Sequence, residues 1–357
     1  MAATAIQRVR RPRAGGRLGG RLPRYVLRRL ALAALTLWLV TIVVFFITNI
    51  LPGNPALVRL GGLASPAAVR AEEKRMGLDR PVPERYWDFV SGAVVGDFGR
   101  SFKTERPVAT DLGDRLPATL ELALLATFLS LLIGVPLGFL AATKRDSAID
   151  HAARTVATLA AAMPIFWLGL VLVFVFAYQL GWAPGTVGRF PLDHEAPPLV
   201  TGFFTIDTLL AGDIAGFFTA LHYLALPVLT LAIIELAPII KMARSSMVET
   251  LATDYVRTSR ALGFSRRQIF FGDALRNALI PVVTLLGIVL GYLVAGNVIV
   301  ETLFSWPGIG RYAFGALTAN DFNAIQGFIL LVAVIYVIIN LAIDLLYAVI
   351  DPRIRLG

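Results

Sequence analysis

Side chains able to catalyse a reaction or to hold a metal ion are few in this chain and far apart. The three histidines, His151, His194 and His222, are not paired at the spacing of metal ligands, and there is no cysteine. None of the four lysines follows a glycine, which excludes the usual phosphate-binding loop of an ATPase. We therefore expect no catalytic residue, no metal site and no cofactor in this chain.

One carboxylate stands inside an apolar run, at Glu235 between Ile234 and Leu236. Burying an isolated carboxylate in hydrocarbon costs several kcal/mol, so this side chain must face protein or water. Two interpretations remain open. Glu235 either lines a passage through the membrane, where it would meet an ammonium group, or makes a structural ion pair or hydrogen bond with a partner subunit.

Polar residues beside other apolar runs are further candidates for such a passage: Asn297, Glu301 and Asp344. Asp344 lies one helical turn after Asn340, near the end of the chain. For Asp344 the competing interpretation is a capping role or a salt bridge with Arg353 or Arg355.

A short turn follows Glu301 and consists of Ser305, Trp306, Pro307 and Gly308. A Pro-Gly pair marks a turn, and we expect these four residues to form a re-entrant gate loop on the outer side of the membrane. The alternative is an ordinary turn whose tryptophan lies at the membrane interface.

Five arginines gather in the segment from Tyr255 to Pro281, between two apolar runs. The pattern predicts a short amphipathic helix over Thr250–Gly263. One face of this helix is formed by Leu251, Tyr255, Thr258 and Leu262. The other face carries Thr253, Asp254, Arg257 and Arg260.

A tight corner is expected after this helix. Gly263 is suited to end it in a left-handed conformation, and Ser265 with Gln268 has the S-x-x-Q pattern of a capping box. Phe264 and Ile269 occupy the two positions of a hydrophobic staple. A corner of this kind either lies on the lipid surface or docks on a cytoplasmic partner, to which a rigid helix can transmit a movement.

Six apolar segments position these residues, and each is long enough to cross a bilayer as a helix. They are Leu30–Leu51, Leu120–Ala142, Val156–Leu180, Tyr223–Met242, Ala278–Val300 and Ala324–Ile350. The chain is 57% hydrophobic and only 16% charged, whereas a soluble domain has about 25% charged residues. We therefore predict an all-α, polytopic membrane protein with six transmembrane helices.

The basic residues indicate the orientation. Nine of the 33 lysines and arginines precede Leu30, whereas the loops Gly181–His222 and Glu301–Asn323 carry one each. The positive-inside rule then places both termini in the cytoplasm. The net charge of +9 is explained in this way and does not indicate a nucleic-acid partner.

This orientation divides the chain into four parts. Residues 1–29 are expected to form a basic, disordered cytoplasmic tail, and residues 30–51 the first transmembrane helix. Residues 52–117 are expected outside the cytoplasm, with short helices, one of them capped by Ser65. Residues 118–357 hold five transmembrane helices and the cytoplasmic loop at about 250–281.

Several motifs follow one another along nearly the whole chain. They are LPGNP, GLDRPVPERYWDF, GDFGRSF, RLPATLELAL, VETLFSWPGIGR and DLLYAVIDPRIR. In the arginine-rich segment, DYVRTSRALGFS…ALRNALIP places Pro281 eighteen residues after Gly263. Together these motifs resemble the permease subunits of ABC importers in the dipeptide, oligopeptide and nickel branch, and the segment resembles their EAA loop. It departs from the consensus at Arg257-Thr258-Ser259, which stands where Glu-Ala-Ala would be.

The resemblance implies the fold of a type I ABC importer permease in a bacterial inner membrane. Besides the lipid bilayer, it implies as partners a second permease subunit, two ABC ATPase subunits that hold ATP and magnesium, an extracytoplasmic binding protein and a short-peptide substrate. The residues that it assigns to ATPase coupling are Thr253, Asp254, Tyr255, Arg257, Thr258, Arg260, Ala261, Gly263 and Ser265.

Two alternatives accompany this interpretation. Nickel complexes or glutathione are possible substrates within the same branch. A different class, the ion-coupled secondary transporter, needs several ionisable residues within its spans, and only Glu235 and Asp344 are counted here.

Overall fold

The computed structural model describes residues 21–50, 55–60, 64–191, 193 and 195–350. Within these residues the fold is helical, and an isolated bridge joins Arg100 to Pro107. The helices of the first half are α1 (Arg21–Ile50), α2 (Pro55–Arg59), α3 (Pro66–Arg75), α4 (Val82–Val95), α5 (Val108–Thr143), α6 (Ala148–Ala162), α7 (Ile165–Leu172) and the π-helix η1 (Val173–Gln179). Those of the second half are α8 (Phe204–Leu210), α9 (Ile214–Leu251), α10 (Asp254–Ala261), α11 (Arg266–Gln268), the π-helix η2 (Ile269–Ala274), α12 (Leu275–Val294), α13 (Val298–Leu303), α14 (Ile309–Thr318) and α15 (Phe322–Ile350).

Five helices in the described part of the chain are long and apolar enough to cross a membrane. A sixth span results if two helices joined at a bend, Ala148–Ala162 and Ile165–Gln179, are counted together as one span. The five are Leu27–Thr48 of α1, all of α5, α9 and α12, and Phe322–Leu346 of α15. The prediction of an all-α, polytopic membrane protein is confirmed. The helices are longer than the apolar runs suggested: α1 begins at Arg21 and α5 at Val108, before Pro117.

The third predicted span is not one straight helix. The expected segment Val156–Leu180 is interrupted at Met163 and Pro164, where α6 and the α7–η1 helix meet at a bend of 102°. The residue before a proline is disfavoured in helical conformation, and Met163 is extended, with φ −81° and ψ 127°. The prediction of an uninterrupted span is therefore wrong.

The fifth predicted span, Ala278–Val300, is also too long. α12 ends at Val294, and Gly296 has a left-handed φ of +93° before the separate short helix α13. Its last residues therefore belong to a different element, which carries Glu301.

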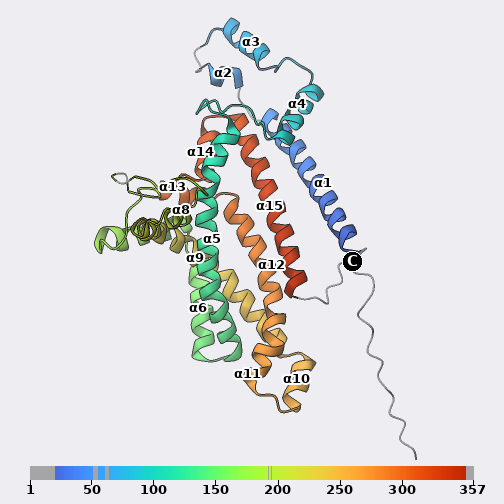
Figure 1. The fold of residues 1–357 in the computed structure, drawn as a ribbon, viewed down its shortest axis with the longest axis vertical. Coiled ribbons are helices and arrows are strands. Elements are labelled where there is room, and N and C mark those ends of the chain that lie inside the picture. Colours follow the sequence, from blue (N-terminus) through green and yellow to red (C-terminus); the bar gives the residue numbers. More distant parts are fainter. Residues whose placement is uncertain (1–20, 51–54, 61–63, 192, 194, 351–357) are drawn as a thin grey trace, which may run out of the picture.

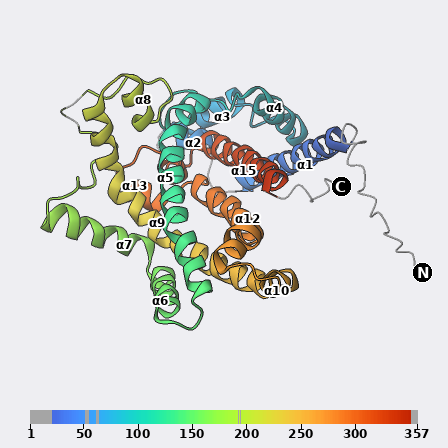
Figure 2. The same cartoon turned by 60° about the horizontal axis from the view of Figure 1, so that its bottom comes forward.

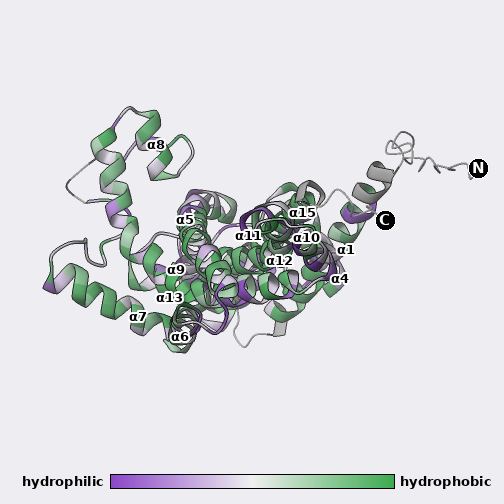
Figure 3. Cartoon of the chain, turned by 90° about the horizontal axis from the view of Figure 1, so that it is seen from below, coloured by the Kyte–Doolittle hydropathy of each residue, from purple (hydrophilic) through white to green (hydrophobic). Residues whose placement is uncertain are grey.

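Some of the short helices lie at two ends of the bundle. α2, α3 and α4 gather at one end, and α10 and α11 at the opposite end (Figure 1). We call these the α3 end and the α10 end. α7 and α8 extend sideways from the bundle, away from α1 (Figure 2). Viewed from the α10 end, hydrophobic residues colour most of α7 (Figure 3), and Phe166, Trp167 and Leu170 of this helix are exposed.

α5 is the central helix of the bundle. It contributes residues to all four hydrophobic clusters, which join it to α6, α9, α12, α14 and α15 along its length. Its approach to α9 is close: a Cβ at Gly138 would lie 2.7 Å from the Cβ of Ala243, and one at Gly134 2.7 Å from the side chain of Ile239. Small residues spaced four apart allow this approach between membrane helices.

Candidate functional site

The arginine-rich segment forms a corner at the α10 end (Figure 1). α9 continues to Leu251, and α10 begins only at Asp254. The expected helix Thr250–Gly263 is therefore wrong at its start, because Thr253 is extended, with φ −70° and ψ 156°. The Thr253 hydroxyl donates to the carbonyl of Thr250 at 2.6 Å, which closes the end of α9.

The turn after α10 has the expected conformation. Gly263 has a left-handed φ of +84°. The N–H of Phe264 donates to the carbonyl of Ser259 at 3.1 Å, and the N–H of Gly263 donates to the carbonyl of Arg260 at 3.0 Å. These are the two bonds of a Schellman motif, so the end of α10 has a defined geometry.

A capping box begins the next helix, as predicted. The Ser265 hydroxyl accepts from the N–H of Gln268 at 3.3 Å, and the side-chain oxygen of Gln268 accepts from the N–H of Ser265 at 2.9 Å. Of the two expected staple residues, Ile269 is buried and Phe264 is exposed. The chain is thus fixed on both sides of Gly263.

The apolar face expected on α10 is not the face that packs on the rest of the chain. Val256 is the buried residue of this helix, whereas Tyr255 is 40% exposed and Leu262 72% exposed. Several residues of the corner are exposed, among them the acidic Asp254. We call one set of them the corner surface: Tyr255, Arg257, Thr258, Arg260, Ala261, Leu262 and Phe264. It combines apolar and cationic side chains at an end of the molecule.

Two polar contacts order the corner. Tyr255 accepts a hydrogen bond on its hydroxyl from the Asn277 side chain at 2.9 Å, which joins α10 to α12. Asp254 pairs with Arg257 at 3.1 Å on the exposed side of α10. The Tyr255 contact spans 22 residues and is the one that connects two elements.

Glu301 belongs to α13 and is fully buried, and its carboxylate lies at the N-terminus of α14. Its carboxylate accepts from the Thr119 hydroxyl at 2.6 Å and from the N–H of Arg311 at 2.8 Å, while the N–H of Ile309 donates to Thr119 at 2.9 Å. A Cβ at Gly308 would lie 2.2 Å from this carboxylate. Burial raises the pKa of Glu301, although the hydrogen bonds from Thr119 and Arg311 act in the opposite direction. Glu301 therefore caps a helix inside the chain.

The turn Ser305–Gly308 packs on α5. Trp306 is fully buried, and its Nε1 donates to the carbonyl of Ala118 at 2.8 Å. The interpretation of an interfacial tryptophan is therefore wrong. Ser305 has a left-handed φ of +55°, and Pro307 is the exposed residue of the four.

A buried ion pair that the sequence analysis missed lies next to this turn. Arg189 donates to the carboxylate of Glu121 at 2.5 Å, and both side chains are almost fully buried. The other carboxylate oxygen of Glu121 accepts from the N–H and the hydroxyl of Thr205. The guanidinium lies 3.9 Å from the ring centroid of Phe204 and 5.6 Å from that of Trp306. Glu121 thus anchors the α7–α9 loop to α5.

Glu121 was detectable in the sequence. It lies within the predicted second span, Leu120–Ala142, so the count of two ionisable residues inside spans was wrong. The same criterion that singled out Glu235 applies to it. The partner, Arg189, is 68 residues away, and no local pattern relates the two.

Glu235 is buried between α9 and α5. One carboxylate oxygen accepts from the Ser130 hydroxyl at 2.9 Å, and the other has no hydrogen-bond partner among the described residues. The side chain faces a helix of its own chain, so the hydrogen bond foreseen with a partner subunit is made within the subunit.

The other passage candidates lie apart from Glu235. Asp344 pairs with Arg29 of α1 at 2.9 Å, and the expected partners Arg353 and Arg355 lie outside the described residues. Asn297 is half-buried and precedes α13. Each of the three acidic candidates contacts a different residue, so the described part of the chain does not bring them together in one polar cluster.

The bundle of spans and the folded corner at its end define a multi-pass membrane protein, and comparison with known proteins places it in a family. Residues 134–356 match the family described as "Binding-protein-dependent transport system inner membrane component", and residues 22–123 match its N-terminal counterpart. The chain belongs to this family of ABC importer permeases. The expected family is confirmed, and it sets aside the ion-coupled secondary transporter.

Curated relatives cover nearly the whole chain. "Dipeptide transport system permease protein DppB" of Alkalihalophilus pseudofirmus is 41% identical over 93% of this chain and 99% of its own length. "Di/tripeptide transport system permease protein DppB" of Pseudomonas aeruginosa is 42% identical over 93% and 98%. "Glutathione transport system permease protein GsiC" of Escherichia coli O1:K1 is 35% identical over 93% and 98%.

Proposed function

We propose that this chain is one of two permease subunits of an ATP-driven importer of short peptides, with dipeptides as the main substrates. The observation that carries the substrate class is the identity of above 40% with permeases named for dipeptide and di/tripeptide transport. The lower identity of the glutathione permease, 35%, makes glutathione the second candidate. Nickel complexes are the third.

The corner surface is the proposed contact with an ATPase subunit. It is built on a short helix that follows the extended residue Thr253 and ends at the Gly263 turn, and it exposes apolar side chains beside Arg257 and Arg260. Exposed apolar side chains at a water-facing end are typical of a protein interface. ATP and magnesium belong to the ATPases, because this chain has no phosphate-binding loop.

The corner connects the proposed ATPase contact to the spans. Val256 is buried beneath α10, and the Tyr255–Asn277 hydrogen bond joins α10 to α12. Closure of two ATPase subunits would move α10 as a rigid element and tilt the attached spans, exposing the passage alternately to the two sides. In this assignment Glu301 and Glu121 hold loops in place, and Glu235 and Asn297 remain the candidates for the passage itself.

The proposed orientation places the α10 end and both termini in the cytoplasm of a bacterial cell and the α3 end outside. The loops at the α10 end hold Lys144, Arg145 and the arginines of the corner, as the positive-inside rule requires. An extracytoplasmic binding protein would then deliver peptide to the α3 end.

The test is reconstitution of the complete transporter in proteoliposomes, with the second permease, the ATPases and the binding protein. We expect uptake of labelled dialanine that requires ATP and the binding protein, and competition by unlabelled dialanine but not by glutathione or nickel salts. The chain alone is expected to show only background ATP hydrolysis.

Two results would change the proposal. If glutathione or nickel competes with uptake and unlabelled dialanine does not, the competing compound would become the proposed substrate. Failure of the ATPases to co-purify with the chain, when both are produced together, would remove the assigned role of the corner surface.

A further inference from the structure

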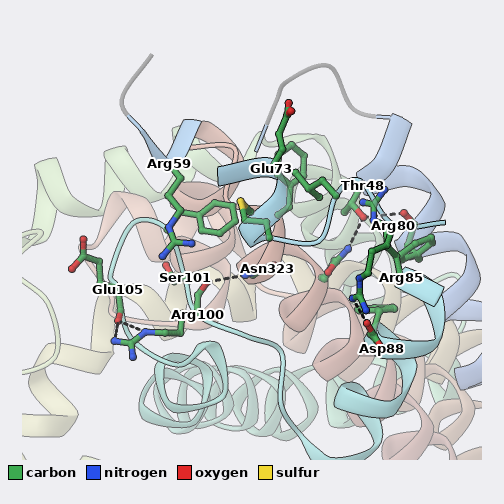
Figure 4. Close-up of a pocket in the computed structure, with 17 residues that line it drawn as sticks. Thr48, Arg59, Glu73, Arg80, Arg85, Asp88, Arg100, Ser101, Glu105 and Asn323 are labelled. Carbon is green, nitrogen blue, oxygen red and sulfur yellow. Dashed lines mark hydrogen bonds and ion pairs between the residues drawn. The ribbon is translucent and has the colours of Figure 1, made fainter. Parts of the chain in front are cut away.

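A cavity of about 1070 Å³ lies at the α3 end (Figure 4). Its lining residues include neither the corner surface nor the passage candidates. Its walls come from the end of α1, from the α2–α4 segment, from the loop before α5 and from the start of α15. Small-molecule sites in proteins have volumes of about 300–1,000 Å³. The cavity is therefore large enough for a ligand of that class.

Four arginines line this cavity: Arg59, Arg80, Arg85 and Arg100. Arg59 pairs with Glu72 at 2.8 Å, and Arg80 pairs with Asp88. Arg100 donates through two nitrogens to the carbonyl oxygen of Glu105, which is a neutral acceptor. A guanidinium has five N–H donors, so these contacts hold Arg59, Arg80 and Arg100 in place and leave donors on these three side chains for a carboxylate.

Carboxylates line the same cavity in nearly equal number. They belong to Glu73, Asp88 and Glu105, one fewer than the arginines. Figure 4 places Arg59, Arg100 and Glu105 on one side and Arg80, Arg85 and Asp88 on the other. Walls of nearly balanced charge suit a ligand that carries both charges. A phosphate or another multiply charged anion would instead meet repulsion from the carboxylates.

Aromatic rings form the apolar part of the wall. Phe45, Phe89, Phe102 and Phe322 line the cavity, and the rings of Phe45 and Phe89 lie 5.9 Å apart. Rings bury a large apolar area without requiring a particular side chain on the ligand. The cavity thus combines charge recognition with side-chain tolerance.

We propose that this cavity is a second binding site for the transported ligand, a free short peptide in its zwitterionic form, on the permease itself. The peptide carboxylate lies at Arg59 and Arg100, the ammonium group lies at Asp88 on the opposite side, and the side chains pack on the phenylalanine rings. The proposal rests on the proposed peptide substrate. Beyond that proposed function, it assigns to the α3 end of the permease a peptide-binding site that does not require the binding protein.

The test measures binding to the full chain in nanodiscs of phosphatidylcholine, with no binding protein present. We expect saturable binding of labelled dialanine by equilibrium dialysis. N-acetyl-dialanine amide, which lacks both charges, should bind at least about tenfold more weakly, because each charge-assisted hydrogen bond lost corresponds to roughly a tenfold change.

Variants locate the binding in the cavity. Arg59→Gln and Asp88→Asn should each weaken dialanine binding about tenfold. The control is Arg70→Gln, an exposed arginine of α3 that does not line the cavity, which should bind as the unmodified chain does. Because Arg59→Gln leaves the buried Glu72 with the longer, 3.8 Å pairing to Arg75, the thermal unfolding of this variant is measured alongside. Asp88→Asn serves as the independent variant at a half-exposed position.

Three results would overturn the inference. They are absence of dialanine binding, equal binding by all variants, and variant-sensitive binding of inorganic phosphate or phosphatidylglycerol in place of dialanine. If the complete transporter takes up dialanine while the isolated chain does not bind it, this inference fails and the proposed function stands.

Discussion

Gly263 is the residue on which the geometry of the corner depends most directly. Its φ is +84°, and a Cβ placed on it would meet nothing within 4 Å. A substitution at Gly263 therefore destabilises the corner only through backbone strain, by about 1 kcal/mol of conformational free energy for alanine. We expect Gly263→Val to impair coupling more than Gly263→Ala, because valine is branched at Cβ. Assembly with the ATPases, ATP hydrolysis and uptake would be measured in one reconstituted preparation.

A matched control for this prediction exists in the same chain. Gly181 also has a positive φ, +64°, and also has open space around its Cα, but it lies in the loop after η1. Gly181→Val should therefore carry similar backbone strain and leave coupling unchanged. Normal assembly, hydrolysis and uptake in Gly263→Val would remove the corner from the mechanism.

Asp207 gives a pH prediction for the loop that Glu121 anchors. Burial acts to raise the pKa of Asp207, but hydrogen bonds from Thr201, Gly202 and Val200 outweigh it and lower the pKa. A carboxylate with a lowered folded pKa stabilises the fold above its unfolded pKa, about 3.9. That stability is lost as the pH falls through the folded value.

We therefore expect hydrogen-exchange protection of the Thr201 and Gly202 amides to fall as the solution is acidified below about pH 4. These two amides donate to Asp207 at 2.7 and 2.9 Å. In Asp207→Asn the same amides should be poorly protected on both sides of that pH. Protection in the unmodified chain that does not change with pH would contradict the assignment.

At the scale of elements, the contact between α10 and α12 is the one that carries the proposed movement. The Asn277 side chain donates to the Tyr255 hydroxyl at 2.9 Å. Tyr255→Phe keeps the ring and removes this bond, which contributes about 1 kcal/mol. We expect ATP hydrolysis to persist while the peptide transported per ATP falls.

A control variant and a double-mutant cycle make this prediction specific. Tyr178→Phe changes an exposed tyrosine of η1, far from the corner, and should have no effect. Asn277→Ala combined with Tyr255→Phe should have less than the sum of the two single effects, because both substitutions remove the same bond. Additive effects would show that the two residues act separately.

The elements that the sequence predicted well are those fixed by neighbouring residues. The Gly263 turn and the Ser265–Gln268 capping box depend on contacts within six residues, and both are present. The apolar runs similarly located the spans, because hydrocarbon thickness sets helix length. The start of α10 was missed because the α9 pattern continues to Leu251 without a proline or glycine to mark its end.

The features that the sequence did not reveal depend on distant residues. Arg189 is 68 residues from Glu121, Trp306 is 188 from Ala118, and Arg29 is 315 from Asp344. Burial of Trp306 in particular cannot be inferred from a turn motif, because it follows from how α5 passes beside that turn. The bend at Met163 and Pro164 had a local signal, the proline, which hydropathy averaging concealed.

At the scale of the whole molecule, the orientation is testable with single cysteines, because the chain has none of its own. Val94 of α4 is 81% exposed at the α3 end, and Leu262 is 72% exposed at the α10 end. Gly92 is unsuitable, because a Cβ there would lie 2.7 Å from the carbonyl oxygen of Asp97. We expect a membrane-impermeant maleimide added outside intact cells to label Val94→Cys and not Leu262→Cys. The reverse pattern would invert the proposed topology.

The central position of α5 has a consequence for the biogenesis of the protein. The hydroxyl of Ser130 finds Glu235 only after a further 105 residues have been made, which takes about 5 to 20 seconds at ribosomal rates of roughly 5–20 residues per second. During that interval Gly134 and Gly138 of the second span also lack the helix on which they pack, whereas Arg189 and Thr205, the partners of Glu121, are made 68 and 84 residues after it. We expect the second span to remain beside the translocon until α9 arrives, so that a nascent chain truncated before α9 would be a substrate for membrane proteases.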